Sequence, residues 1–127
     1  MNQNSLPFKS YRVLISGDRN WTGSELEEKI WSIFVSFPSN TEIVHGACKG
    51  VDMTADKIGR EFGFPIKVFH ADWNKYGKSA GTIRDSQMLD YGIDVVYAFH
   101  QHIETSRGTK NTIIQANKRN IPVALIK

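Results

Sequence analysis

The chain has 127 residues and a formal net charge of +3, with 40% hydrophobic and 23% charged residues, a composition typical of one soluble globular domain with a buried core. Apolar runs stop at about five or six residues, which excludes a membrane-spanning segment, and the small positive charge favours an anionic ligand without by itself predicting nucleic-acid binding. A single cysteine excludes an internal disulfide and favours a reducing, cytoplasmic location.

The chain starts with a segment, residues 1–9, whose first seven residues lack the charged and apolar regions of a secretory signal. We expect it to be a flexible lead-in to a single domain within residues 1–127. The first strand is predicted at Tyr11–Gly17, where an apolar run ends in a glycine. A helix is predicted over residues 24–37, because Ser24 and Glu27 have the spacing of a capping box.

Two apolar lines run along this first helix. The line expected to face the sheet has helical spacing and consists of Leu26, Ile30, Ile33 and Phe37. Trp31 and Val35 form a second line beside it, which a monomer would leave in contact with water. Such a width indicates either a deep groove or a partner subunit, and we predict a homodimer or larger homo-oligomer that uses this helix.

The remaining elements alternate between strand and helix. Strands are predicted at Thr41–His45 and at 65–69, 93–99 and 122–126, and helices at 51–62, 80–91 and 109–119. The strands are continuous apolar runs, which is typical of a parallel sheet covered on both faces. Because crossovers between parallel strands are right-handed, the sequence predicts an α/β, Rossmann-like three-layer sandwich of about five parallel strands with helices on both faces.

Glycines and cations gather in the four loops that follow the strands, at the edge where sheets of this kind bind ligands. Glycine lets backbone N–H groups approach a ligand closely, and the cations neutralise its charge. We therefore predict a site for a phosphate-bearing small molecule. Its predicted residues are Gly17, Arg19, Gly46, Ala47, Lys49, Gly50, Asp52, Trp73, Lys78, Ser79, Gly81, Arg84, Arg107, Gly108 and Thr109.

The third of these loops, residues 71–79, is the richest in such signals. It connects an apolar strand to a helix N-terminus, where free N–H groups and the helix dipole favour an anion. Arg84 lies about one turn into that helix and adds a forked, charged donor. We expect one phosphate to be surrounded by residues from this stretch and from the fourth loop: Lys78, Ser79, Arg84, Gly108 and Thr109. The alternative is that Gly77 and Gly81 only form a turn and Arg84 is a solvated surface cation.

These motifs together resemble the YspA-type branch of the SLOG superfamily, which is named for the DNA-processing Smf/DprA proteins and the LOG phosphoribohydrolases. The resemblance extends from about Arg12 to the C-terminus and rests on Gly17-Asp18-Arg19, on residues 46–52 and 71–88, and on Ser106 to Thr109. It implies a Rossmann-like fold that binds nucleotides or nucleotide-derived ligands. Some members cleave the N-glycosidic bond of nucleoside monophosphates, and others are thought only to bind or sense.

The sequence departs from the phosphoribohydrolases at one important place. Arg84 and Met88 match their Arg-x-x-x-Met helix, but the Gly-Thr turn is followed here by Lys110 and not by glutamates. An oxocarbenium-like transition state requires a nearby negative charge, and a lysine offers the opposite. The resemblance therefore supports the phosphate half of the site and leaves the catalytic half without its carboxylate.

Three aspartates are candidates for that missing group or for other roles. Asp18 is a candidate catalytic acid, a contact for a ribose hydroxyl, or a salt-bridge partner of Arg19. Asp72, at the exit of the third strand, is a candidate catalytic acid that we expect to be buried. Asp52, in the first turn of a helix, most simply interacts with the helix dipole, with direct catalysis as the alternative.

Several other side chains in the loops have two interpretations each. Trp73 and Tyr76 are candidates for stacking on a base or for a hydrophobic lid. Cys48 is either a nucleophile or a small buried residue. His45 occupies a position where the family usually has glycine, so the second loop is either tighter or offers an imidazole to the ligand.

The function that the sequence favours is the sensing or sequestering of a nucleotide-derived small molecule. The alternative is a nucleotide N-glycosidase that uses Asp18 or Asp72. DNA binding of the DNA-processing type is weaker, because no basic stripe with interleaved aromatics is present, so we do not expect nucleic acid as a partner. The short apolar runs likewise lead us to expect no membrane partner. We expect no cofactor and no metal, since His70, His100 and His102 lack a metal-ligand spacing with a nearby acid.

Overall fold

The computed structural model describes residues 9–127, so all but the last residue of the expected lead-in 1–9 lies outside the described residues. Five parallel strands form one sheet in the order β3-β2-β1-β4-β5. They are β1 (Tyr11–Gly17), β2 (Thr41–His45), β3 (Ile66–Val68), β4 (Val95–Phe99) and β5 (Val123–Ile126). Their order confirms the predicted parallel sheet.

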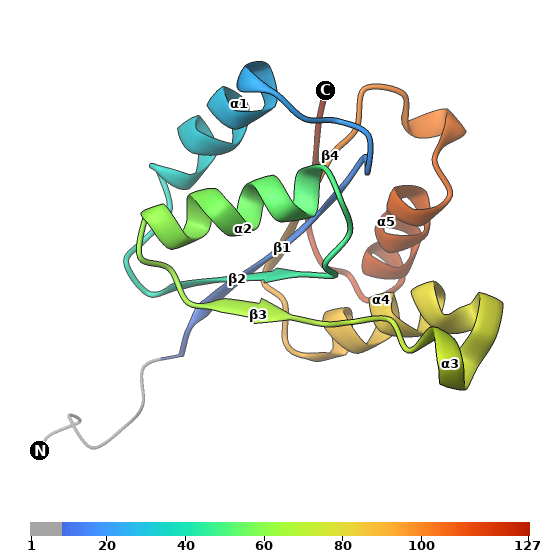
Figure 1. Ribbon diagram of the computed structural model, residues 1–127. Coiled ribbons are helices and arrows are strands. Elements are labelled where there is room, and N and C mark those ends of the chain that lie inside the picture. The colour runs from blue at the N-terminus through green and yellow to red at the C-terminus, as the bar shows by residue number, and fades with distance from the viewer. Residues whose placement is uncertain (1–8) are drawn as a thin grey trace, which may run out of the picture.

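Helices cover both faces of this sheet (Figure 1). On one face, α1 (Ser24–Phe34) and α2 (Val51–Glu61) pack against Val13 and Ile15 of β1. On the other face, α4 (Ala80–Asp90) and α5 (Gly108–Lys118) pack against Leu14 of β1 and Val96 of β4. Alternate residues of β1 therefore belong to two separate cores, as period-two side-chain geometry requires. The α/β Rossmann-like sandwich is confirmed.

The first helix differs from its prediction at both ends. Its N-cap is Gly23, and no side chain caps it, so the predicted capping box is wrong because Ser24 is already the first helical residue. The α-helix ends at Phe34, after which Phe37 N–H donates to the Phe34 carbonyl in a tighter turn. The buried positions of the helix are consequently Leu26, Ile30 and Phe34, while Ile33 and Phe37 are only partly buried.

The segment predicted as a loop before α4 is largely helical. It contains the short helix α3 (Trp73–Tyr76) and a 3₁₀ turn, η2 (Gly77–Ser79), which runs directly into α4. Ala80 N–H donates to the Gly77 carbonyl, so the start of α4 is not the open N-terminus that the sequence predicted. Asp72 is exposed and caps α3, its Oδ1 accepting the Lys75 N–H at 3.1 Å, and the prediction of a buried acid there is wrong.

The topology opens a crevice beside the central strand. β1 pairs with β2 on one side and with β4 on the other. The chain leaves β1 toward α1 on one face and leaves β4 toward α5 on the opposite face, with a second 3₁₀ turn, η3 (Ile103–Thr105), on the way. The connections diverge at this switch point, which is where open α/β sheets bind ligands. Within residues 9–127, no helix is long and apolar enough to cross a membrane.

Candidate functional site

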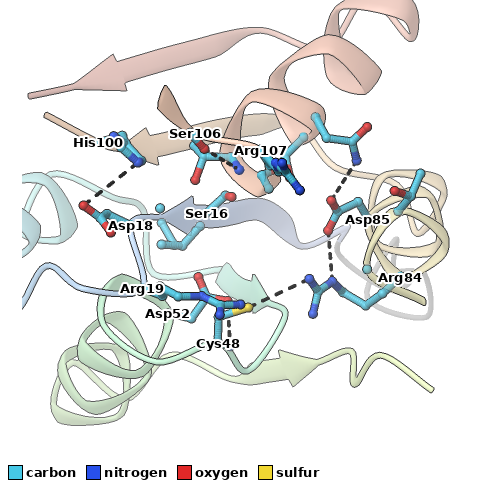
Figure 2. A pocket seen from close by; sticks show the side chains of 18 of the residues that line it. Ser16, Asp18, Arg19, Cys48, Asp52, Arg84, Asp85, His100, Ser106 and Arg107 are labelled. Atoms are coloured by element: carbon cyan, nitrogen blue, oxygen red, sulfur yellow. Dashed lines mark hydrogen bonds and ion pairs between the residues drawn. The ribbon is translucent and has the colours of Figure 1, made fainter. Parts of the chain in front are cut away.

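A pocket of about 780 Å³ lies beyond the carboxyl ends of β1 and β4 (Figure 2). Ser16 and Gly17 of β1 line it, together with His100 just after β4. The loop after β1, the start of α2, α4 and the start of α5 supply the rest of its wall. The loops predicted from their glycines and cations therefore do converge on one cavity.

Most of the predicted site residues line this pocket. They are Gly17, Asp18, Arg19, Asp52, Trp73, Lys78, Gly81, Arg84, Arg107, Gly108 and Thr109. A second hollow of about 600 Å³ is lined by Gly46, Ala47 and Lys49 and shares Arg19, Trp73 and Arg84 with the first. Gly50, Asp72 and Ser79 line neither space.

The second loop is held by its own side chains. Asp52 Oδ2 accepts the N–H groups of Gly46 and Cys48, both at 3.1 Å. His45 Nδ1 accepts the Ala47 N–H at 3.0 Å, and Ala47 has a left-handed φ of 63°. These three N–H groups are thus already bonded within the protein, and it is the side chains of this loop that remain for a ligand.

His45 has a structural role, which is the tighter-loop alternative. Its side chain is buried, and its Nε2 donates to Asp56 Oδ2 at 2.7 Å while Nδ1 accepts from Ala47. Both ring nitrogens are therefore occupied. The other alternative, in which this imidazole reaches a ligand, is wrong, because the ring is buried and lines neither hollow.

The carboxyl group of Asp52 is buried, with only 4% of the residue exposed. Burial raises the pKa of Asp52 to about 6, although His45, the two N–H donors and Arg84 each act to lower it. An acid with such a pKa changes its charge within the range of ordinary buffers. Of the three candidate aspartates, Asp52 and not Asp72 is the buried one.

Arg84 connects α4 to the second loop. Its Nη1 donates to the Gly46 carbonyl at 2.7 Å, and its Nε donates to Asp85 Oδ1 at 2.9 Å. A Cβ at position 46 would lie 2.7 Å from Nη1, so only glycine admits this contact. The Arg84 side chain is 12% exposed, and the alternative of a solvated surface cation is wrong.

Gly50 has an equally internal role. Its φ is 70°, and a Cβ there would lie 2.4 Å from the Asp18 carbonyl oxygen. The glycine thus lets the second loop pack directly on the first. At Gly46 and Gly50 the close approach is between parts of the protein, whereas the sequence suggested approach to a ligand.

The N-terminus of α5 is capped by Ser106, a residue that sequence reasoning did not assign to the site. Ser106 Oγ accepts the Thr109 N–H at 3.0 Å and the Lys110 N–H at 3.3 Å. The signal was present, because serine shortly before a helical pattern is a common cap. Lys110 Nζ contacts the Glu104 carbonyl at 3.4 Å, and Lys110 does not line the pocket. Lys110 is therefore not part of the pocket wall, although its neighbours Thr109 and Asn111 are.

Three exposed cations line the pocket from three different segments. They are Arg19 after β1, Lys78 in η2 and Arg107 before α5. Within residues 9–127, none of the three side chains forms an ion pair or a hydrogen bond. The salt bridge to Arg19, one of the alternatives for Asp18, is accordingly not formed. These cations remain available to an anionic ligand.

Asp85 and Asn111 are polar residues of the pocket that the sequence prediction did not include. Asp85 is buried between Arg84 Nε and Asn111 Nδ2, each 2.9 Å from one of its oxygens. Asp85 directly follows Arg84 in the Arg-x-x-x-Met helix, and its position beside a predicted phosphate-binding cation was the available signal. The residues after Gly108 and Thr109 include no nearby carboxylate, and Asp85 supplies one beside Asn111 in the same pocket.

Trp73 stands at the mouth of the site. It is 59% exposed on α3 and lines both hollows, whereas Tyr76 lines neither. An exposed tryptophan beside a polar cavity is suited to stacking on a planar ring. Of the two aromatic candidates, only Trp73 is placed for that role.

Within residues 9–127, no group of three or more His, Cys, Asp and Glu side chains is arranged to hold a metal ion. His70 lines only the second hollow, while His100 and His102 line the first. The polar chemistry of the pocket therefore rests on its cations, its carboxylates and these histidines.

Two solved structures share the fold. DNA processing protein A (DprA) from Streptococcus pneumoniae matches with a TM-score of 0.76 and 15% identity over 93% of this chain and 50% of DprA, so the chain spans about half of that protein. TM1055, a structural-genomics target, matches with a TM-score of 0.63 and 17% identity over 88% of this chain and 71% of its own. Identities this low establish the fold alone.

Sequence comparison is more specific. The Gene 61 protein of Mycobacterium phage D29 is 34% identical over 121 residues, which cover 88% of this chain and 93% of the phage protein. The model of the YspA, cpYpsA-related SLOG family matches residues 11–76, from β1 to the end of α3. With the sheet order and the crevice beside β1, these matches show that the chain belongs to the YspA, cpYpsA-related SLOG family.

Proposed function

We propose that this protein binds a phosphate-bearing nucleotide or nucleotide-derived molecule in the pocket beyond β1 and β4, as a sensor or a sequestering protein. The observation that carries the proposal is the set of three unpaired cations, Arg19, Lys78 and Arg107, within the described part of the chain. Three like charges around one cavity repel one another, and a polyanionic group relieves that repulsion.

The rest of the pocket suits the remainder of a nucleotide. A volume of about 780 Å³ is within the range of small-molecule sites. Trp73 offers an exposed ring at the mouth, and base stacking on an aromatic contributes roughly 1–3 kcal/mol. The resemblance to the SLOG superfamily supports a nucleotide-derived ligand. The phosphate contacts we assign are side-chain cations, since Ser106 and Asp52 already occupy the nearby N–H groups.

A charge-neutralising variant tests the proposal. The triple substitution Arg19→Gln, Lys78→Gln and Arg107→Gln should weaken binding of nucleoside mono- and diphosphates by at least about 2 kcal/mol, because each lost charge-assisted hydrogen bond contributes about 1.5–3 kcal/mol. Isothermal titration calorimetry measures the affinity. Lys118→Gln, at the far end of α5 from the pocket, is the matched control and should bind as the wild type does. Equal affinity of the triple variant and the control would overturn the proposal.

A nucleotide N-glycosidase is the second candidate, and one observation favours it. Asp18 places a carboxylate in the pocket with its Oδ2 free of hydrogen bonds from residues 9–127. Chromatography for free base, after long incubation of AMP, GMP, CMP and UMP with concentrated protein, separates this candidate from a pure binder. Turnover that Asp18→Asn abolishes would support the enzyme, whereas absent turnover with retained binding would support the binder.

DNA binding remains the weakest candidate. The likeness to DprA concerns the fold, and the net charge of this chain is only +3. Phosphate contacts make DNA binding strongly dependent on salt, so a gel shift that persists at low salt and is lost at moderate salt would be its minimal support.

A further inference from the structure

His100 presents an unpaired donor to the pocket. The residue follows β4, is 8% exposed and lines the cavity. Its Nδ1 accepts the His102 N–H at 3.0 Å. An accepting Nδ1 carries no proton, so the neutral ring has its proton on Nε2. Within residues 9–127, this Nε2 has no hydrogen-bond partner.

Asp18 faces that donor from the loop after β1 (Figure 2). Its Oδ1 accepts the Asn20 N–H at 2.9 Å, which fixes the carboxylate, and its Oδ2 lies 3.9 Å from His100 Nε2. A nitrogen-to-oxygen distance of this length is too great for a direct hydrogen bond. The His100 donor and the Asp18 acceptor therefore lie near each other across the switch point but do not form a hydrogen bond with each other.

The chemistry of the pair selects one kind of ligand group. An oxygen about 2.8 Å from both atoms would subtend an angle of about 90° between them, which a hydroxyl can accommodate. A hydroxyl accepts from Nε2–H and donates to Oδ2 at the same time. A phosphate oxygen has no proton to give Asp18 and would be repelled by it, and an ammonium group has no lone pair for His100.

We propose that Asp18 and His100 form a hydroxyl-binding subsite that holds a sugar hydroxyl of the nucleotide ligand and selects ribose over deoxyribose. This inference rests on the proposed function and adds which part of the ligand the protein recognises, namely a sugar hydroxyl. It also gives the ligand a direction, with the phosphate at Arg19, Lys78 and Arg107 and the sugar at the Asp18–His100 pair. Asp18 then acts as a specificity residue.

The experiment compares each of AMP, GMP, CMP and UMP with its 2′-deoxy and 3′-deoxy analogues by titration calorimetry. The wild type should bind at least one ribonucleotide on the order of 10–100-fold more tightly than one of its deoxy analogues. The reason is that loss of the hydroxyl leaves the His100 donor and the Asp18 carboxylate unpaired inside the bound complex.

Two variants test the assignment of the pair. Asp18→Asn keeps an oxygen for the Asn20 N–H but replaces Oδ2 by a donor, and His100→Asn keeps an acceptor for the His102 N–H but removes the Nε2 donor. Each should lower the ratio of ribonucleotide to deoxynucleotide affinity to near 1. His100→Gln, which retains a distal N–H, should restore part of the ratio. Asp90→Asn, an exposed position on α4 outside the pocket, is the control and should keep the full ratio.

The outcomes separate the two proposals. Equal wild-type affinity for ribo- and deoxynucleotides would overturn the hydroxyl subsite and leave the proposed function standing. A wild-type preference that survives in both asparagine variants would overturn the assignment to Asp18 and His100. Absence of binding to every nucleotide would overturn the subsite together with the proposed function.

Discussion

At the scale of single residues, Asp52 makes the stability of the fold depend on pH. Burial raises the pKa of Asp52 from 3.8 to about 6 in the folded state, so folding favours the protonated acid. Its contribution to stability is therefore complete below about pH 4 and is lost as pH rises through about 6. The neutral acid retains a carbonyl oxygen that can accept from both Gly46 and Cys48.

Asp52→Asn should remove this pH dependence, because an amide oxygen can accept the same two N–H bonds without ever becoming charged. The variant should gain stability relative to the wild type as pH rises from 4 to 7, by on the order of 2–3 kcal/mol for a shift of about two pKa units. Urea unfolding of both proteins across that range measures the difference. Parallel stability profiles would contradict the assignment of a raised pKa to Asp52.

Arg84 should matter for stability as well as for any ligand. Its guanidinium is mostly buried between Asp85 and the Gly46 carbonyl. Arg84→Ala leaves the Asp85 carboxylate uncompensated on that side, and breaking a buried pair typically costs about 3–5 kcal/mol. Lys57→Ala, which removes an exposed pair with Glu27, should cost at most about 1 kcal/mol. Similar unfolding free energies for the two variants would show that Arg84 is dispensable to the fold.

The roles of these residues were only partly predictable. The sequence placed Asp18, Asp52 and Arg84 at the right edge of the sheet, because the apolar runs predict a parallel sheet and ligands bind such sheets beyond the carboxyl ends of the strands. It could not distinguish which acid is buried. Asp52 is buried where its Oδ2 accepts two loop N–H groups. Asp72 stays at the surface, where its Oδ1 caps α3. The bond from Arg84 to Gly46 joins positions 38 apart, and no local pattern encodes such a contact.

At the scale of elements, periodicity identified every strand and the four long helices, and it failed at two kinds of place. The four-residue helix α3 is too short to show a helical period. The end of α1 was placed too late because Phe37 continues the apolar pattern past the last helical residue. Phe37 still packs in the core, with its ring centroid 5.4 Å from that of Phe34, so the pattern reported burial correctly and helicity wrongly.

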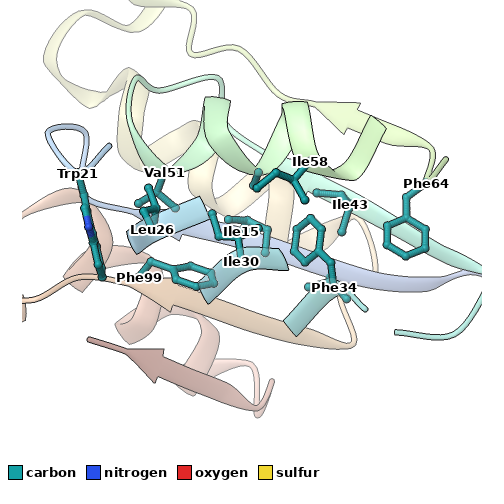
Figure 3. Close-up of a cluster of buried hydrophobic side chains, with 12 residues drawn as sticks. Ile15, Trp21, Leu26, Ile30, Phe34, Ile43, Val51, Ile58, Phe64 and Phe99 are labelled. Carbon is teal, nitrogen blue, oxygen red and sulfur yellow. The ribbon is translucent and has the colours of Figure 1, made fainter. Parts of the chain in front are cut away.

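The core beneath α1 and α2 fixes the ends of the two strands that carry pocket residues. Figure 3 shows Ile15 of β1 and Phe99 of β4 beside Leu26, Ile30 and Val51. Ile15 and Phe99 are fully buried, and each immediately precedes pocket residues, Ser16 in the first case and His100 in the second. Sites on well-packed strand ends hold their side chains more precisely than sites on free loops. The Asp18–His100 separation is thus set by the packing of two central strands.

At the scale of the whole molecule, the outer surface of α1 and α2 carries an apolar patch formed by Trp31, Val35 and Phe62. Trp31 is 50% exposed and Val35 is 56% exposed. The ring centroids of Trp31 and Phe62 are 5.0 Å apart. Trp31 in α1 and Val35 directly after it belong to the second apolar line of the sequence, and their exposure agrees with the prediction that a monomer leaves them in contact with water. The patch lies on helices whose opposite sides form the core, away from the pocket wall.

We propose that this patch joins two or more copies of the chain, with Trp31 as the central contact. Sedimentation velocity at micromolar concentration should show a dimer or larger species. Trp31→Arg should shift it toward monomer by weakening association at least about 30-fold, the effect of losing an interface residue that contributes about 2 kcal/mol or more. Trp73→Arg, an equally exposed tryptophan at the pocket mouth, is the matched control and should leave the assembly intact. In a Trp73→Phe background, fluorescence reports only Trp31 and the buried Trp21, so resistance of the signal to acrylamide indicates that Trp31 is covered. A monomer whose Trp31 emission is readily quenched would show that the patch stays exposed to solvent and that the site functions within a single chain.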